Sequence, residues 1–216
     1  MKPLTDNCPK PLLMAGGKTL IEYHIEKLAA AGIKEVVINH AWLGEQIVNA
    51  LGNGERWGIN IHYSPEHNGA LETAGGIKKA LPLLQSEQGD TPFLVVNGDI
   101  FIDYNFTDIP SLKDNQLGHL WLVQNPKHNP DGDFGITEGL LSNNDGSRYT
   151  FSGVALYRPT LFAPLKDNNI EKLAPLLRQG ADRLAISASI MPGRWIDVGT
   201  PERLSDLNQQ LLGNDT

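Results

Sequence analysis

Two aspartates lie just after or within apolar segments, and both could hold a metal ion. Asp99 follows the most apolar run of the chain, residues 93–96, through Asn97 and Gly98. A carboxylate just past the end of a buried parallel strand points into the ligand crevice of an α/β sheet. Asp197 lies within a second apolar segment, where an unpaired charge is expensive. A Mg²⁺ ion shared by both carboxylates and by phosphate oxygens would supply the missing partners.

Each aspartate also has a structural explanation. Asn-Gly and Gly-Asp are common turn dipeptides, so a simple turn accounts for Asp99 about as well. Asp197 could cap a helix that begins near Pro201, although Thr200 is better placed to do so. Both explanations stay open for these residues taken singly.

Two lysines are candidates for contacts with phosphate. Lys10 stands between Pro9 and Pro11, which stiffen the backbone from which its side chain departs. Lys172 falls in the first turn of a predicted helix, where the helix dipole disfavours a cation and a partner of opposite charge is expected. The alternative for each is an exposed, solvated lysine.

A double glycine opens another predicted helix, after Glu72, Thr73 and Ala74. Gly75 and Gly76 would let the backbone approach a flat ligand closely, and a helix start offers free N–H groups. A base edge or a phosphate could dock there. Glu72 could equally be a charge that the helix dipole favours.

A scaffold for these residues follows from the hydrophobic pattern. Helical periodicity is found in residues 19–31, 43–51, 77–84, 171–178 and 201–212. Apolar or alternating strand patterns are found in residues 36–38, 59–63, 93–96, 120–123 and 151–157. This alternation predicts an α/β, Rossmann-like fold with a mostly parallel sheet and helices on both faces. We expect a single domain over residues 1–216.

Composition narrows the function further. The net charge of −7, from 18 Lys and Arg against 25 Asp and Glu, provides no basic face for nucleic acid. No apolar run approaches the roughly 20 residues that span a bilayer, and no signal peptide opens the chain. We therefore expect a cytoplasmic protein without nucleic-acid or membrane partners. Cys8, the single cysteine, is interpreted as a bystander, and the six histidines show no metal-ligand spacing.

The order of the motifs is more specific than any one of them. P-L-T, P-K-P-L, E-T-A-G-G, N-G-D, F-S-G and W-x-D-V-G-T follow one another between Pro3 and Leu204. This series closely resembles the sugar-nucleotide pyrophosphorylases, a nucleotidyltransferase family. The phrases I-N-H-A-W-L-G, L-E-T-A-G-G-I-x-K-A-L-P-L-L and K-L-A-P-L-L-R are similar to its uridylyltransferase branch that serves peptidoglycan recycling.

The resemblance implies an activity and a set of roles. UMP would pass from UTP to a sugar 1-phosphate, N-acetylmuramate 1-phosphate in that branch, with Mg²⁺ as cofactor. The catalytic residues would be Lys10, Asp99 and Asp197, the two aspartates being the metal ligands. The nucleotide would contact Lys10, Glu72, Thr73, Ala74, Gly75, Gly76 and Asn97, where Ala74 replaces a glycine of many relatives. The sugar phosphate would contact Asp133, Gly153 and Lys172.

The start of the chain departs from the family pattern. The family opens with a strand and a loop of the type L-A-A-G-x-G-x-R-M directly before P-L-T, and here Met1 stands at that last methionine. We expect the domain to be incomplete at its N-terminus, either because an internal methionine was taken as the start or through a natural truncation. The first explanation is favoured.

Two other functions remain open at this point. The same chemistry could serve another pair of substrates, such as mannose 1-phosphate with GTP. A nucleotide- or sugar-binding module without turnover is the alternative from a different class. The oligomeric state, monomer or small homo-oligomer, is left open.

Overall fold

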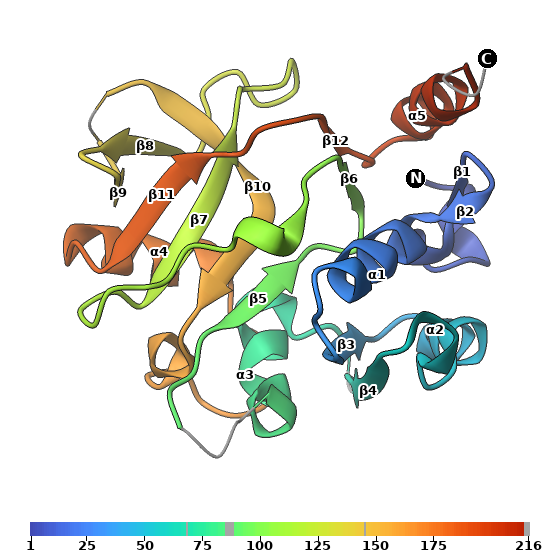
Figure 1. Ribbon diagram of the computed structural model, residues 1–216, viewed down its shortest axis with the longest axis horizontal. Coiled ribbons are helices and arrows are strands. Elements are labelled where there is room, and N and C mark those ends of the chain that lie inside the picture. Colours follow the sequence, from blue (N-terminus) through green and yellow to red (C-terminus); the bar gives the residue numbers. More distant parts are fainter. Residues whose placement is uncertain (68, 85–88, 145, 214–216) are drawn as a thin grey trace. The chain divides into compact units, whose positions relative to one another are not determined.

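Helices and strands alternate along the chain in the computed structural model, which describes residues 1–67, 69–84, 89–144 and 146–213 (Figure 1). The chain divides into two units. Unit 1 comprises Met1–Gly69, Asn97–Asp108 and Gly193–Thr216, and unit 2 comprises Ala70–Val96 and Ile109–Pro192. The prediction of one domain over residues 1–216 stays a prediction.

Unit 1 contains three helices and three two-stranded sheets in its described residues. The helices are α1 (Leu20–Ala30), α2 (Gly44–Leu51) and α5 (Pro201–Gly213). The strands are β1 (Met14–Ala15), β2 (Lys18–Thr19), β3 (Glu35–His40), β4 (Asn60–Pro65), β6 (Ile100–Ile102) and β12 (Trp195–Asp197). Strands β3 and β4 pair in parallel, whereas β1 with β2 and β6 with β12 pair antiparallel.

Helix α1 begins where the sequence predicts it, at a capping box. The backbone N–H of Thr19 donates to Glu22 Oε2 at 2.9 Å, and the Thr19 hydroxyl donates to the same oxygen at 2.7 Å. The helix buries Leu20, Ile21 and Ile25 on one face, at the spacing that the sequence shows. The predicted helix over residues 19–31 is confirmed to within one residue at each end.

A buried histidine joins α1 to β6. His24 is 3% exposed, and its Nε2 lies 2.9 Å from the carbonyl oxygen of Ile100, so this nitrogen carries a proton and donates it. Ile100 is the first residue of β6 and directly follows Asp99. Burial lowers the pKa of His24 from its ordinary 6.5 to about 4, so the ring is neutral at pH 7.

Unit 2 is built on one six-stranded sheet with two helices. Its strands are β5 (Phe93–Val96), β7 (Gly118–Val123), β8 (Phe134–Thr137), β9 (Leu140–Ser142), β10 (Arg148–Tyr157) and β11 (Ile186–Ile190). They lie in the order β5-β10-β7-β11-β9-β8. The helices are α3 (Glu72–Leu84) and α4 (Leu173–Asp182).

The α/β class is confirmed, but the expected mostly parallel sheet is wrong. β10 runs antiparallel to β5, β7 and β8, and among the described residues of this sheet only β11 and β7 form a parallel pair. Apolar runs give no strand direction, so the sequence could not show that β10 returns between β5 and β7. β5 lies at the edge of this order, so it is half-buried rather than fully buried as the sequence suggests.

One hydrophobic core cluster of unit 2 lies on one face of the sheet. Alternate residues of β7, β10 and β11 point to this face and pack against the apolar sides of α3 and α4. The contributing side chains from these elements are Leu120, Leu122, Ala155, Tyr157, Ile186, Ala188, Ala74, Ile77, Leu81, Leu173, Leu176, Leu177 and Ala181. None of the described helices is long and apolar enough to cross a membrane.

We predict that His24 makes the fold less stable in mild acid. Since its folded-state pKa of about 4 lies below the ordinary 6.5, the unfolded chain binds more protons between these values. Stability therefore falls as the pH drops from 6.5 towards 4, by up to about 3 kcal/mol for this group. His24→Gln, which keeps an N–H donor for Ile100, should make the melting temperature fall less steeply between pH 7 and pH 4.5, with a remaining fall because burial also lowers the pKa of His119 to about 4.

The matched control is His67→Gln, at an exposed histidine of the same unit. It should leave the pH profile of the melting temperature as it is in the unaltered chain. An equal slope in the His24 variant would contradict this assignment.

Candidate active site

The structure brings the two aspartates to the same end of one ladder in unit 1. β12 pairs with β6 so that Asp197 stands opposite Ile100, and the N–H of Val198 donates to the carbonyl oxygen of Asp99 at 3.1 Å. Adjacent strands thus present one carboxylate each at neighbouring positions. A metal ion shared by the two carboxylates stays a prediction.

Lys10 lies directly against the first of these carboxylates. Its Nζ is 2.8 Å from Asp99 Oδ2, and the two side chains are 33% and 37% exposed. Lys10 begins a short 3-10 helix after Pro9, which holds the residue in a turn rather than on a flexible tail. The two residues are 89 positions apart in the sequence. Their contact in the structure shows that Lys10 is more than a solvated surface lysine.

Asp197 has a cationic partner that the sequence analysis missed. Arg203 Nη1 lies 2.7 Å from Asp197 Oδ2, with both side chains about one-third exposed. A Cβ at Gly199 would meet Arg203 Nη2 at 2.6 Å, so the glycine leaves room for the guanidinium. The cap of α5 is Thr200, whose hydroxyl accepts the N–H of Arg203 at 3.3 Å. Asp197 is therefore held by an ion pair.

These residues fit a divalent cation. Two partly exposed carboxylates on neighbouring strands are the hard oxygen donors that Mg²⁺ prefers. Within the part of the chain that the structure describes, no group of three or more His, Cys, Asp or Glu side chains forms a metal site. The remaining ligands of a bound Mg²⁺ would therefore be water or phosphate oxygens, as is usual for this ion.

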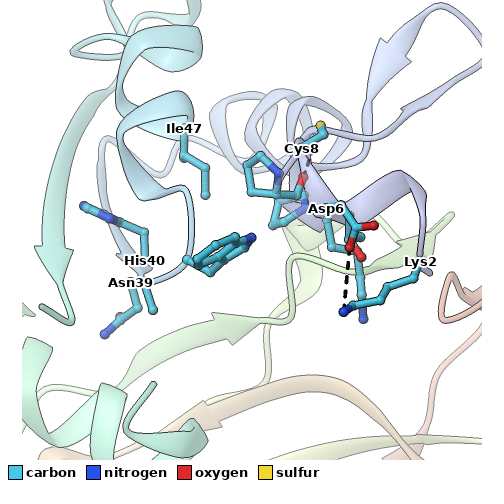
Figure 2. Close-up of a pocket in the computed structure, with 12 residues that line it drawn as sticks. Lys2, Asp6, Cys8, Asn39, His40 and Ile47 are labelled. Carbon is cyan, nitrogen blue, oxygen red and sulfur yellow. Dashed lines mark hydrogen bonds and ion pairs between the residues drawn. The ribbon is translucent and has the colours of Figure 1, made fainter. Parts of the chain in front are cut away.

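A cavity of about 590 Å³ opens beside Lys10 within unit 1. Lys2 and Asp6, whose charged groups are 3.8 Å apart, line it on one side, with Asn39 and His40 across from Lys2 (Figure 2). Trp42 also lines it and is 71% exposed. Lysines and an indole surface suit an anionic group with an attached flat or apolar part.

Cys8 lines the same cavity without a reactive setting. Its Sγ donates a weak hydrogen bond to the carbonyl oxygen of Pro9 at 3.6 Å. Burial raises the pKa of the thiol, so it stays protonated at pH 7 and is a poor nucleophile. This agrees with its interpretation as a bystander.

The predicted base-binding segment starts α3 in unit 2. Glu72 has φ = +61°, a left-handed conformation that is strained for a residue with a Cβ. The expectation of free N–H groups is wrong at two positions, because Ala74 and Gly75 both donate to the carbonyl oxygen of Glu171, at 3.0 and 3.1 Å. Both are buried, whereas Glu72 and Thr73 are exposed.

Asp133 contacts β10 two residues before Gly153, within unit 2. Asp133 Oδ2 accepts the N–H of Phe151 at 2.8 Å, which fixes its carboxylate against β10. Gly153 has φ = +82° at a shift in the pairing of β10 with β7, between Phe151 and Val154. Bulges of this kind redirect side chains and often border active sites.

Lys172 is the N-cap of α4, which begins two residues later than the predicted helix over residues 171–178, and its side chain is exposed, in agreement with the alternative of a solvated lysine. The predicted site residues are divided between the two units. Unit 1 contains Lys10, Asn97, Asp99 and Asp197, and unit 2 contains the others. The ligand contacts of all these residues stay predictions.

Comparisons with known proteins identify the family. A family model described as nucleotidyl transferase matches residues 1–140. The chain is 50% identical to N-acetylmuramate alpha-1-phosphate uridylyltransferase of Neisseria meningitidis serogroup B, over 99% of this chain and 93% of that protein. It is 29% identical to the mannose-1-phosphate guanyltransferase of Yarrowia lipolytica, over 94% of this chain but only 58% of that longer protein.

Solved structures agree in fold. HddC of Yersinia pseudotuberculosis, complexed with GMP-PN, superposes with a TM-score of 0.74 at 17% identity, covering 97% of this chain and 93% of that one. Apo UDP-glucose pyrophosphorylase gives a TM-score of 0.71 at 19% identity, covering 100% and 94%. At such identities the likeness concerns the fold alone. Since the family match spans more than half of the sequence and one relative is half identical along nearly all of it, this chain belongs to the nucleotidyl transferase family.

Proposed function

We propose that this protein transfers UMP from UTP to N-acetylmuramate 1-phosphate and releases pyrophosphate. The observation that carries the proposal is the 50% identity, end to end, to a uridylyltransferase of that name. The arrangement of Lys10 and Asp99 beside Asp197 supports the chemistry independently. The lysine can bind a phosphate, and the carboxylates can bind the cation that accompanies it. The reaction belongs to cytoplasmic recycling of peptidoglycan sugars.

The transfer needs no covalent intermediate. An oxygen of the sugar phosphate attacks the α-phosphorus of UTP in line, and the bond to the bridging oxygen of the leaving pyrophosphate breaks. The protein contributes by positioning the reactants and by stabilising charge. Before substrate arrives, Lys10 and Arg203 each neutralise one carboxylate, so this cluster has no net charge.

Lys10 is proposed to change partners when UTP binds. Its ammonium leaves Asp99 and meets oxygens of the triphosphate, where it offsets the negative charge that develops in the transition state. The cavity that opens beside Lys10 and is also lined by Lys2 is the proposed place for the triphosphate tail. Arg203 keeps the Asp197 carboxylate in a fixed orientation.

Asp99 and Asp197 would hold the divalent cation that this family uses, and we propose Mg²⁺. Bound there, the ion would lower the repulsion between phosphate oxygens and fix the line of attack. On the sugar side, Lys172 is the proposed partner of the phosphate, and Asp133 and Gly153 shape the region that faces the sugar. By resemblance, the proposed contacts of the base are Glu72, Thr73, Ala74, Gly76 and Asn97, whereas Gly75 packs against the backbone of residues 169–171.

Neutralising either aspartate should abolish turnover. We predict that Asp99→Asn and Asp197→Asn each lower kcat by about a thousandfold, because a metal site supplies several kcal/mol of transition-state stabilisation. Pyrophosphate release at saturating UTP and Mg²⁺ is the measurement. Asp103→Asn is the matched control, since Asp103 follows the far end of β6 and contacts Lys27 at 3.5 Å. Near-normal turnover in either site variant would refute the metal assignment.

The substrate pair is tested by competition between sugars and between bases. We expect N-acetylmuramate 1-phosphate with UTP to give at least about a hundredfold higher kcat/KM than glucose, mannose or N-acetylglucosamine 1-phosphate, a difference of roughly 3 kcal/mol. The 29% identity to a guanyltransferase makes mannose 1-phosphate with GTP the second candidate. A preference for that pair would replace the proposed one. Nucleotide binding without pyrophosphate release would indicate a binding module.

A further inference from the structure

A segment just before α4 is clamped onto the start of α3 by its backbone. The N–H of Glu171 donates to the carbonyl oxygen of Leu71 at 3.0 Å. The carbonyl oxygen of Glu171 accepts the N–H groups of Ala74 and Gly75 at 3.0 and 3.1 Å. One peptide oxygen thus takes up two first-turn N–H groups of the helix, which would otherwise need another partner.

This clamp depends on the absence of a side chain at position 75. A Cβ on Gly75 would run into the carbonyl oxygen of Asn169, and it would stand 3.2 Å from the backbone nitrogen of Glu171. Backbone atoms cannot swing aside as a flexible side chain can. Gly75 is therefore explained by the close approach of residues 169–171, without any contact to a base.

The clamp fixes the backbone of Lys172 from both sides. Its preceding residue, Glu171, is held by three hydrogen bonds to the start of α3, and the following residue, Leu173, is buried in the core of unit 2. Lys172 itself is extended, with φ = −77° and ψ = 143°, and its side chain is exposed. A long lysine side chain is mobile, so its reach depends on where this backbone is held.

We infer that Gly75 is a positioning residue for the sugar phosphate. Because Gly75 has no side chain, Glu171 can pack against the start of α3 and hold the backbone of Lys172 in place. The inference rests on the proposed function, in which Lys172 meets that phosphate. It assigns Gly75 to the sugar-phosphate side of the reaction rather than to the uracil. A Cβ at position 75 should thus weaken the binding of sugar 1-phosphate and leave the binding of UTP nearly unchanged.

The test is a double-mutant cycle of Gly75→Ala and Lys172→Ala. KM is measured for N-acetylmuramate 1-phosphate and for UTP in both single variants and in the double variant. We expect Gly75→Ala to raise the sugar-phosphate KM about tenfold and the UTP KM less than about twofold. If Gly75 acts through Lys172, the double variant should resemble Lys172→Ala alone, because the two effects are then not additive. Gly213→Ala, at a glycine whose added Cβ meets nothing within 4 Å, is the control.

The outcomes separate this inference from the proposed function. Additive effects in the cycle, or a rise in the UTP KM instead, would overturn the role of Gly75 while the activity stands. An unaltered chain without turnover on this pair would overturn both. If Gly75→Ala does not fold, Ile170→Gly loosens the same clamp at a residue that is 70% exposed. It should give the same selective rise in the sugar-phosphate KM, and its absence would contradict the inference.

Discussion

Asp99 and Asp197 stand at neighbouring positions of the β6–β12 pair, and each is matched by a cation of unit 1. Lys10 neutralises Asp99 at 2.8 Å and Arg203 neutralises Asp197 at 2.7 Å. Each ion pair is partly exposed and contributes on the order of 1 kcal/mol or less to stability. Their importance lies elsewhere: they hold both carboxylates in a fixed orientation until substrate provides other partners.

The scaffold around these pairs is specific in its details. His24 ties α1 to the first residue of β6, next to Asp99, and the pairing of β6 with β12 sets the position of Asp197. Gly199 leaves the space through which Arg203 reaches its partner. In unit 2, the Glu171 carbonyl plays a comparable part for α3 and for the backbone before Lys172. Local backbone features therefore determine where the charged side chains lie.

The sequence predicted what depends on neighbouring residues and missed what depends on distant ones. The helix over residues 19–31 is confirmed because its apolar spacing is a local signal. The antiparallel course of β10 and the Arg203–Asp197 pair leave no local trace, since strand direction and side-chain reach are set by tertiary packing. At Gly75 the sequence predicts the close approach of a flat ligand, whereas the group that approaches it in the structure is the carbonyl oxygen of Asn169, which lies 94 positions onward and could not be identified from spacing alone.

We propose that Lys10 exchanges Asp99 for the triphosphate when UTP binds. A crystal structure of the protein with UTP and Mg²⁺ tests it directly through one distance, from Lys10 Nζ to Asp99 Oδ2. The account predicts that this distance grows well beyond the 2.8 Å of the free chain and that Nζ comes within hydrogen-bond reach of a phosphate oxygen. Lys10 still paired with Asp99 while UTP is bound would contradict it.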